Sequence, residues 1–271
     1  MGTLYEAEVR AWQAETDATQ AKAHVEALLN STSWRITAPL RWCARKFVKT
    51  PTKTASQLPV FPLRNYVQWG GDLEIVEPTV VDGNVSFEEL TTIASIVAHH
   101  QPNTIFEIGT FDGRTTLNMA LNAPVSSKVY TLDLPASGLH NTFHELNVHE
   151  RKYVDKPSSG ARYANRIGSE KITQLHGDSA TFDFSEFTGK MDMVFIDGSH
   201  TRAYVEADTR TAMLLRSSRG IILWHDYGSC WDDVTDTLNT LRATDLRFKS
   251  LFQIADTSIA VMPSSGLAHA I

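Results

Sequence analysis

The run MVFIDGSH at residues 193–200 constrains the fold of this chain more than any other stretch. Its first four residues are apolar, as expected of a parallel strand buried on both faces, and the run then stops at the carboxylate of Asp197. The imidazole of His200 follows shortly after. In open α/β sheets, ligands bind in the crevice outside the carboxyl ends of the strands. The run therefore predicts a strand that presents an acid and a candidate base to a binding crevice.

Three further apolar runs end at polar or small residues. They are residues 104–109 before the turn TFDGR, residues 128–132 before Asp133, and residues 220–224 before His225 and Asp226. The carboxyl ends of parallel strands meet at one edge of a sheet. We therefore expect these acids and imidazoles to converge, and this convergence is the strongest functional signal in the sequence.

The order of the apolar patterns predicts the topology of the main domain. The sequence SFEE at residues 86–89 fits a capping box, so a helix precedes the first strand. Strands and helices then alternate, as in a parallel sheet with crossover connections. The later elements are expected at residues 172–177 (strand), 202–215 (helix), 234–241 (helix), 251–255 (strand) and 258–262 (strand). The short gap between the last two strands demands an antiparallel hairpin. The predicted fold is α/β, a doubly wound Rossmann-like sheet with one reversed strand.

An N-terminal helical extension is predicted at residues 1–30. Apolar residues recur there at alternating spacings of three and four, the pattern of a coiled-coil-like helix, at Leu4, Ala7, Ala11, Ala14, Ala18, Ala21, Val25 and Leu28. Because most of these residues are alanine, a lone pair of such helices would be marginally stable. Two interpretations stay open: self-association into a homo-oligomer, and packing of the helix on its own domain.

A basic and aromatic segment with a linker is predicted at residues 31–79, ahead of a main domain at residues 80–271. All six charged residues between positions 31 and 53 are Lys or Arg. Such a segment can lie on an anionic membrane surface, and a solvated linker or docking arm is the alternative. Because the chain as a whole carries a net charge of −6, the main domain is acidic, which argues against a nucleic-acid partner.

The composition favours a globular protein of the cytoplasm. With 42% hydrophobic residues the chain can bury a core, but no apolar run approaches the roughly 20 residues that cross a bilayer. The first residues lack the order of a secretory signal. Cys43 and Cys230 lie far apart without metal-ligand spacing, which suits a reducing compartment. We therefore expect a cytoplasmic location, with peripheral contact at the inner face of the membrane left open.

The turn after the run at residues 104–109 has the features of a cofactor site. Gly109 and Gly113 stand where the backbone must turn tightly and approach a ligand. Asp133 ends the next strand, where an acid can bind ribose hydroxyls. The turn reads ExGxxxG rather than the dinucleotide pattern GxGxxG, and Glu107 would repel a pyrophosphate but suits an ammonium group. These residues indicate an adenosine-type cofactor that carries an amino-acid moiety.

The ordered motifs of this domain resemble the class I S-adenosylmethionine-dependent methyltransferases. More narrowly, FEIGTFDGRTT, VYTLDLP, FIDGSH and IILWHDY resemble the small metal-dependent O-methyltransferases of the macrocin and rhamnosyl type, which modify sugars in bacterial glycans and natural products. The resemblance covers about residues 80–263. It implies that the methionine end of the cofactor lies near Glu107, Gly109, Thr110 and Gly113, the ribose on Asp133, and the adenine beside Asp178 and Ser179. A cap of the following turn is the structural alternative for Ser179.

The resemblance also implies a reaction centre for methyl transfer to a sugar hydroxyl. The hydroxyl must lose its proton as it attacks, and a divalent cation with a nearby base can assist. We interpret Asp197 and Asp226 as Mg²⁺ ligands, with His225 as a third contact, and His200 as the general base. An imidazole ligand would also suit manganese or another transition ion. The structural alternative is that these residues only pack and cap turns.

The polar insertion at residues 135–168 is too long for a simple connector. It contains His140, His144, His149, Arg151, Lys152, Arg162 and Tyr163. We predict that it forms a lid over the substrate crevice, and its polarity favours a carbohydrate acceptor. A solvated excursion without a role is the alternative.

The predicted function is therefore an S-adenosylmethionine-dependent, metal-assisted O-methyltransferase acting on a sugar hydroxyl, in bacterial surface polysaccharide biosynthesis. LLNSTSWRITAPLRW resembles a stretch in bacterial glycan-assembly proteins, which suggests contact with such enzymes through residues 1–53. Two other functions stay open. One is a hydroxylase or oxidoreductase on the same fold, and the other is a non-enzymatic cofactor-binding scaffold in a glycan-assembly complex.

Overall fold

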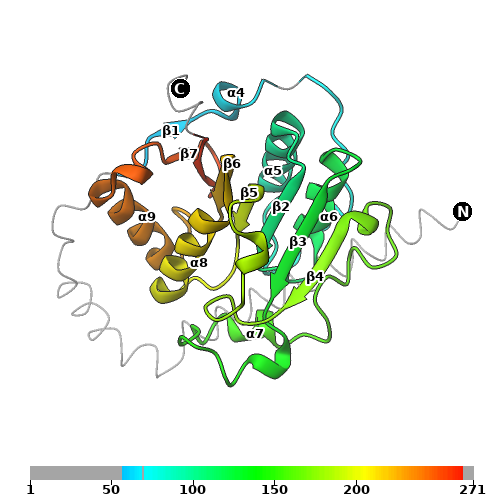
Figure 1. The fold of residues 1–271 in the computed structure, drawn as a ribbon, viewed down its shortest axis with the longest axis vertical. Helices are drawn as coiled ribbons and strands as arrows, with labels where there is room; N and C mark the ends of the chain where they lie inside the picture. Colours follow the sequence, from blue (N-terminus) through cyan, green and yellow to red (C-terminus); the bar gives the residue numbers. More distant parts are fainter. Residues whose placement is uncertain (1–56, 69, 265–271) are drawn as a thin grey trace, which may run out of the picture. The chain divides into compact units, whose positions relative to one another are not determined.

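The computed structural model describes residues 57–68 and 70–264 (Figure 1). Its strands are β1 Val60–Phe61, β2 Thr104–Ile108, β3 Lys128–Asp133, β4 Ile172–His176, β5 Met191–Ile196, β6 Arg216–Trp224, β7 Phe252–Ile254 and β8 Ala260–Met262. Its helices are α4 Leu63–Tyr66, α5 Phe87–His100, α6 Arg114–Asn122, α7 Arg151–Val154, α8 Arg202–Leu215 and α9 Asp232–Thr244. Short 3₁₀ turns are η1 Ala136–Gly138, η2 Ser169–Lys171, η3 Ser185–Phe187 and η4 Leu246–Phe248. The predicted coiled-coil helix and the basic run that follows it lie outside the described residues.

All strands join one sheet in the order β1-β7-β8-β6-β5-β2-β3-β4. Every pairing is parallel except those of β8, which runs antiparallel to β6 and to β7. The predicted Rossmann-like α/β sheet with a terminal antiparallel hairpin is thus confirmed. The order reverses between β2 and β5, and a sheet of this kind binds ligands outside the carboxyl ends at such a switch point.

Helices cover both faces of the sheet (Figure 1). Along β2, Phe106 and Ile108 belong to the core that contains residues of α8 and α9, whereas Ile105 belongs to the core of α5 and α6. This alternation follows from the two-residue period of a strand. Because both faces are covered, the central strands are apolar on both sides, and polar residues are left for the strand ends.

The N-terminal end of α5 confirms the capping box. Ser86 Oγ accepts a hydrogen bond from the Glu89 amide at 3.1 Å, and a Glu89 carboxylate oxygen accepts one from the Ser86 amide at 2.9 Å. These bonds satisfy donors that the first helical turn leaves unpaired. They also hold the Glu89 side chain at the carboxyl edge of the sheet, where it contacts a residue of the site described below.

Strand β1 was not predicted, because a two-residue strand has no readable period. It pairs in parallel with β7, and the Phe61 ring packs edge-on against Phe252, with ring centroids 5.5 Å apart. The Leu58 amide just before it donates to the Tyr227 hydroxyl at 2.9 Å. Part of the segment that was read as a linker therefore belongs to the sheet.

The insertion after β3 lies at the lower end of the sheet in Figure 1, where it carries α7. Arg162 Nε lies 2.8 Å from an Asp112 carboxylate oxygen, and the Phe143 amide donates to Asp178 at 2.6 Å. These bonds attach the insertion to the loops after β2 and β4. It therefore runs across the strand ends, as the lid prediction requires.

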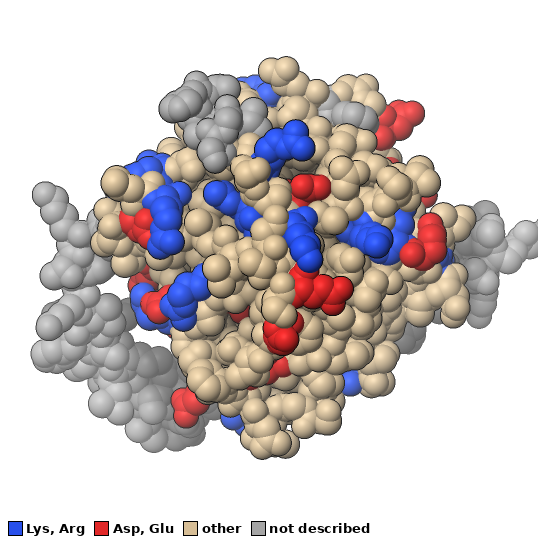
Figure 2. Space-filling view, in the orientation of Figure 1, with Lys and Arg blue, Asp and Glu red and all other residues tan. Residues whose placement is uncertain are grey.

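The surface carries charges of both signs. On the face shown in Figure 2, Lys and Arg side chains lie among Asp and Glu side chains, with uncharged surface between them. Within the described part of the chain, no helix is both long enough and apolar enough to span a membrane.

Candidate active site

A cavity of about 340 Å³ opens at the carboxyl ends of β2, β3, β5 and β6. Of the residues predicted for the site, eight line it: Gly109, Asp133, Asp178, Ser179, Asp197, His200, His225 and Asp226. The insertion contributes four further lining residues, Leu146, Glu150, Tyr153 and Val154. One cavity therefore joins the predicted cofactor end to the predicted reaction centre, with the insertion as part of its wall.

Glu107, Thr110 and Gly113 are not among the residues that line the cavity. Glu107 is completely buried behind it and accepts hydrogen bonds from the hydroxyls of Thr116 and, at 2.5 Å, Thr131. Burial raises the pKa of Glu107 to about 8, against the two hydroxyl bonds that lower it. Its hydrogen bonds tie β2 to β3 and to α6, and its contact with the cofactor stays a prediction.

Gly109 is required by the close approach of two strand ends. Its φ is +100°, and a Cβ at this position would lie 2.0 Å from the backbone oxygen of Asp197. Neither condition admits a larger residue. The backbone amide of Asp197 in turn donates to the Ile108 carbonyl at 2.8 Å. The glycine therefore allows the loops after β2 and β5 to meet at the floor of the cavity.

Asp133, the predicted ribose ligand, is held by the insertion. Its Oδ2 atom lies 2.7 Å from Lys156 Nζ and accepts a hydrogen bond from Ser159. At the predicted adenine position, Asp178 accepts bonds from the Tyr204 hydroxyl at 2.9 Å and from the insertion. The two acids at the cofactor end are thus fixed in place by bonds from the insertion.

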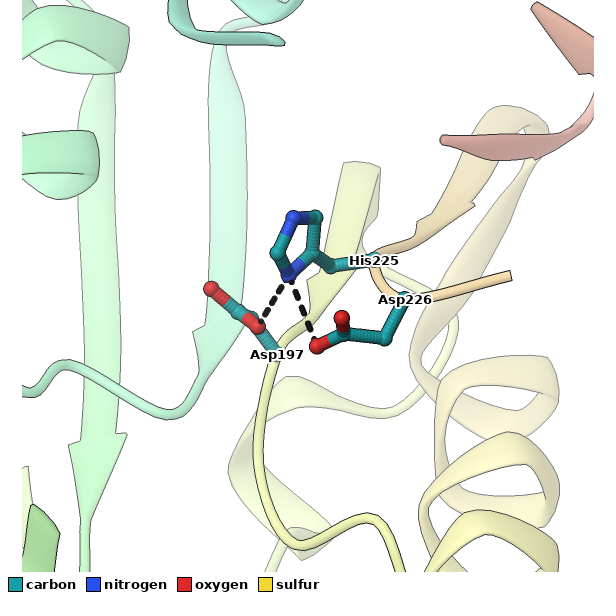
Figure 3. Close-up of side chains that lie close together, drawn as sticks. All are labelled: Asp197, His225 and Asp226. Carbon is teal, nitrogen blue, oxygen red and sulfur yellow. Dashed lines mark hydrogen bonds and ion pairs between the residues drawn. The ribbon is translucent and has the colours of Figure 1, made fainter. Parts of the chain in front are cut away.

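Three residues form a cluster with the donor set of a metal site (Figure 3). Asp197 follows β5, while His225 and Asp226 follow β6, and their candidate ligand atoms all lie within 4.8 Å of one another. His225 Nδ1 lies 2.9 Å from Asp197 Oδ1 and 3.0 Å from Asp226 Oδ2. Asp226 adopts a left-handed φ of 64°, which is uncommon for a residue other than glycine. Two carboxylates and one imidazole converging in this way fit a divalent cation.

The far side of His225 is held by Glu89 of α5. The Oε2 atom of Glu89 lies 3.2 Å from His225 Nε2, and its Oε1 atom accepts hydrogen bonds from the amide and hydroxyl of Ser258. A carboxylate on one imidazole nitrogen leaves the other nitrogen to face a metal, a pairing common among metal-binding histidines. Glu89 therefore orients His225 with Nδ1 toward the two aspartates.

His200 lies between Asp226 and the insertion. Its Nε2 atom is 2.8 Å from Asp226 Oδ2, yet it has no well-directed hydrogen bond among the described residues. Its Nδ1 atom is 2.7 Å from Glu150 Oε1, and its ring stacks on Trp231 with centroids 4.4 Å apart. The imidazole is thus held on one face by Trp231 and at Nδ1 by Glu150, and its Nε2 atom faces Asp226.

The acids dominate the electrostatics of this cluster. Burial favours neutral imidazoles, but the carboxylates of Asp226 and Glu150 outweigh it and raise the pKa of His200 to about 9. Burial likewise opposes the charge of His225, and Asp197 with its neighbours raises that pKa well above its usual range. Burial alone would raise the pKa of Asp226. The two imidazoles outweigh it, so this pKa lies far below its ordinary value. The site is therefore built from charged groups and attracts positive charge.

Sequence reasoning missed Glu89 and Glu150. Glu89 was identified only as part of the helix cap, which it also is. Glu150 lies in an insertion without periodicity, and the histidines and basic residues around it drew attention instead. The one signal for Glu150 is the isolated acid ahead of the basic pair Arg151 and Lys152.

Residues 106–227 match the model of a protein family described as a methyltransferase domain, Methyltransf_24. The matched region runs from β2 to the residue after Asp226, so it contains the strand ends that build the cavity. The part of this chain that contains the cavity is therefore similar to methyltransferase domains.

Several solved structures are similar to this chain. The O-methyltransferase TomG from Streptomyces achromogenes, solved with SAM, is 15% identical, with a TM-score of 0.48 over 69% of this chain and 84% of its own. The SAH-bound Podospora anserina methyltransferase PaMTH1 is 12% identical, with a TM-score of 0.46 over 68% and 81%. An O-methyltransferase from Bacillus cereus, in complex with SAH, is 15% identical, with a TM-score of 0.45 over 68% and 84%. No curated protein matches the sequence.

Proposed function

We propose that this chain is an S-adenosylmethionine-dependent, metal-assisted O-methyltransferase that acts on a sugar hydroxyl, in the biosynthesis of a bacterial surface polysaccharide. The observation that carries the proposal is the single cavity that contains Asp133 at one end and the cluster of Asp197, His225 and Asp226 at the other. An acid placed to bind a ribose and a metal-type donor set in one cavity suit metal-assisted methyl transfer to a hydroxyl. The match to a methyltransferase domain supports the methyl-transfer part of the proposal.

The reaction moves a methyl group from a sulfonium to an alcohol oxygen. The sulfur–methyl bond breaks as the oxygen–methyl bond forms, the sulfonium becomes a neutral thioether, and the hydroxyl proton leaves. When bound by Asp197, His225 and Asp226, a divalent cation supplies charge that stabilises the acceptor oxygen and offsets the carboxylates that raise the pKa of His200. His200 Nε2 then takes the hydroxyl proton.

The other residues of the cavity orient the reactants. Asp133 binds the ribose hydroxyls, and the loop at Asp178 and Ser179 borders the adenine. The insertion closes the cavity with Leu146, Tyr153 and Val154, which excludes water from the transfer step. Polar residues in the lining, among them Asn84 and Ser199, can offer hydrogen bonds to the hydroxyls of a sugar acceptor.

The decisive experiment is methyl transfer to carbohydrate. The purified chain is incubated with isotopically labelled S-adenosylmethionine, a divalent cation and glycan extracts of its source organism, and labelled products are identified by mass spectrometry. We expect label in a sugar O-methyl group, and loss of that label on chelation. Label only on a non-carbohydrate product would contradict the sugar, and transfer that persists in excess chelator would contradict the metal.

Variants separate this function from a non-enzymatic scaffold. Asp197→Asn is expected to abolish transfer, and His200→Ala to lower it about 10²- to 10⁴-fold to a residual rate that can still be measured, with cofactor affinity by calorimetry retained. Asp197→Asn is also expected to weaken Mn²⁺ binding, followed by electron paramagnetic resonance without any turnover. The matched control is Asp236→Asn on the exposed surface of α9. A scaffold predicts the reverse: both site variants keep function, and deletion of residues 1–53 abolishes it.

A further inference from the structure

Glu150 is an almost fully buried acid in a segment that is otherwise mostly exposed. Its exposed fraction is 4%, whereas both neighbours in sequence, His149 and Arg151, are exposed. The turn that holds it is local: the Asn147 amide donates to Glu150 Oε2 at 3.0 Å, and the Tyr153 amide donates to the Glu150 carbonyl at 2.9 Å. A buried charge is costly unless it is paired, so its partners indicate what the residue does.

Those partners beyond the local turn belong to one short loop, between β5 and α8. The Ser199 hydroxyl donates to Glu150 Oε2 at 3.1 Å, and the His200 backbone amide donates to Oε1. The His200 ring completes the set, with Nδ1 at 2.7 Å from Oε1. A single side chain of the insertion therefore binds both the backbone and the imidazole of the candidate base, fifty positions further along the chain.

This contact determines how the His200 ring is oriented. The Glu150 carboxylate holds Nδ1 on the side of the insertion, as in other pairs of an acid and a functional histidine. Nε2 then points to the other side, toward Asp226, whose Oδ2 atom lies 2.8 Å away without a well-directed hydrogen bond. Trp231, stacked on the ring at an interplanar angle of 8°, prevents the ring from turning away.

We propose that Glu150 is a positioning residue through which the insertion assembles the reaction centre: closure over the cavity and orientation of His200 are one event. This inference rests on the proposed methyl transfer. An acceptor enters while the insertion is open and the imidazole is not fixed. When the insertion closes, the Glu150 carboxylate reaches the loop after β5 and sets His200 Nε2 toward the cavity. Transfer is thus coupled to exclusion of water.

The test compares Glu150→Gln with Glu145→Gln, an exposed acid of the same insertion. Glutamine keeps the shape of the side chain but removes its charge. We expect kcat to fall about 10- to 100-fold, as for other residues that orient a functional histidine, while the affinity for S-adenosylmethionine and its KM stay unchanged. Glu145→Gln is expected to behave as the wild type. Glu150→Asp, which retains the charge, is expected to recover part of kcat.

A double-mutant cycle excludes a merely structural role. In the His200→Ala background, Glu150→Gln is expected to cause no further loss of kcat, because its effect acts through the imidazole. An additive loss in the double variant would overturn the proposal. So would wild-type kcat in Glu150→Gln, or a loss of cofactor affinity equal to the loss of kcat.

Hydrogen exchange tests the contact independently of catalysis. The His200 amide, which donates to Glu150, is expected to exchange at least tenfold faster in Glu150→Gln and at the wild-type rate in Glu145→Gln. If the wild-type chain transfers no methyl group, the proposed function fails, and this measurement still decides whether Glu150 anchors the loop. An unchanged exchange rate in Glu150→Gln overturns the anchoring. If Glu150→Gln does not fold, Glu150→Asp carries the same exchange measurement.

Discussion

At the scale of single residues, the cavity depends on positions where no larger side chain fits. Gly109 is the clearest case, because its missing side chain is what lets the loops after β2 and β5 touch. Gly189 offers a matched comparison. It also has a positive φ, of +70°, but a Cβ there would meet nothing within 4 Å.

We therefore expect different costs for alanine at these two glycines. Gly189→Ala should lower the free energy of unfolding by about 1–2 kcal/mol, the cost of a left-handed backbone alone. Gly109→Ala adds a collision with the Asp197 carbonyl and should cost more than about 4 kcal/mol, or prevent folding. Urea denaturation measures both. Equal costs would show that the close approach of the two loops is not rigid.

Glu107 gives the stability of the protein a specific pH dependence. Its pKa of about 8 in the folded chain lies above the ordinary value of 4.5, because it is fully buried. As the pH rises from 4.5 to 8, the unfolded chain ionises this group first, so its contribution to stability is lost across that window. The side chain of Glu107→Gln stays uncharged at every pH. Between pH 5 and pH 8 the free energy of unfolding of the wild type should therefore fall by a few kcal/mol more than that of Glu107→Gln.

The check is the free energy of unfolding of both proteins at several pH values, with Glu186→Gln as the control. Glu186 is an exposed acid of η3. A difference between Glu107→Gln and wild type that does not change with pH would mean that Glu107 is ionised in the folded protein. In that case the carboxylate would be charged beside the cavity, as the cofactor prediction from the sequence supposed.

At the scale of elements, the sequence predicted those features that an apolar period or the end of a strand marks. Asp197 and Asp226 could be placed together because parallel strands deliver their carboxyl ends to one edge. Strand β1 could not be predicted, since two residues carry no period. Glu150 reaches His200 only through the path of an irregular insertion, and tertiary contacts of that kind leave no local pattern.

Two of the ion pairs that attach the insertion differ in how far water reaches them. Lys156 and Asp133 are largely shielded from water, with side chains 12% and 9% exposed, whereas Lys152 and Asp82 form an exposed pair. Lys156→Met should therefore lower the free energy of local opening of the insertion by roughly 1.5–3 kcal/mol, the usual contribution of a hydrogen bond to a charged group. Lys152→Met should leave the attachment of the insertion nearly unchanged, because an exposed ion pair contributes little to stability.

Hydrogen exchange across residues 146–160 measures this release. We expect amides there to exchange about tenfold faster or more in Lys156→Met, while those of β5 and β6 keep the wild-type rate. The argument fails if both lysine variants loosen the segment equally. The buried pair of Lys156 and Asp133 would then hold the insertion no more firmly than the exposed pair of Lys152 and Asp82 does.

At the scale of the whole molecule, the contacts group the described residues, 57–68 and 70–264, into one compact unit. The sequence placed the start of the main domain at residue 80, yet the residues before that point contribute to the core. Leu58, Tyr66 and Val67 are 3%, 6% and 8% exposed, and β1 extends the sheet beside β7. Two truncations can therefore locate the boundary by experiment.

A chain that begins at residue 55 should unfold at the same temperature as the full-length protein and keep its affinity for S-adenosylmethionine. A chain that begins at residue 80 loses three buried side chains, each contributing roughly 1.5–3 kcal/mol when apolar. That loss is a large part of the 5–15 kcal/mol that typically separates folded from unfolded domains, so this chain should melt far lower or fail to fold. Calorimetry of the three chains decides the matter. If the chain from residue 80 is as stable as the longer ones, β1 and α4 do not contribute to the stability of the fold. The hydrogen bond from the Leu58 amide to Tyr227 would then not be required for folding either.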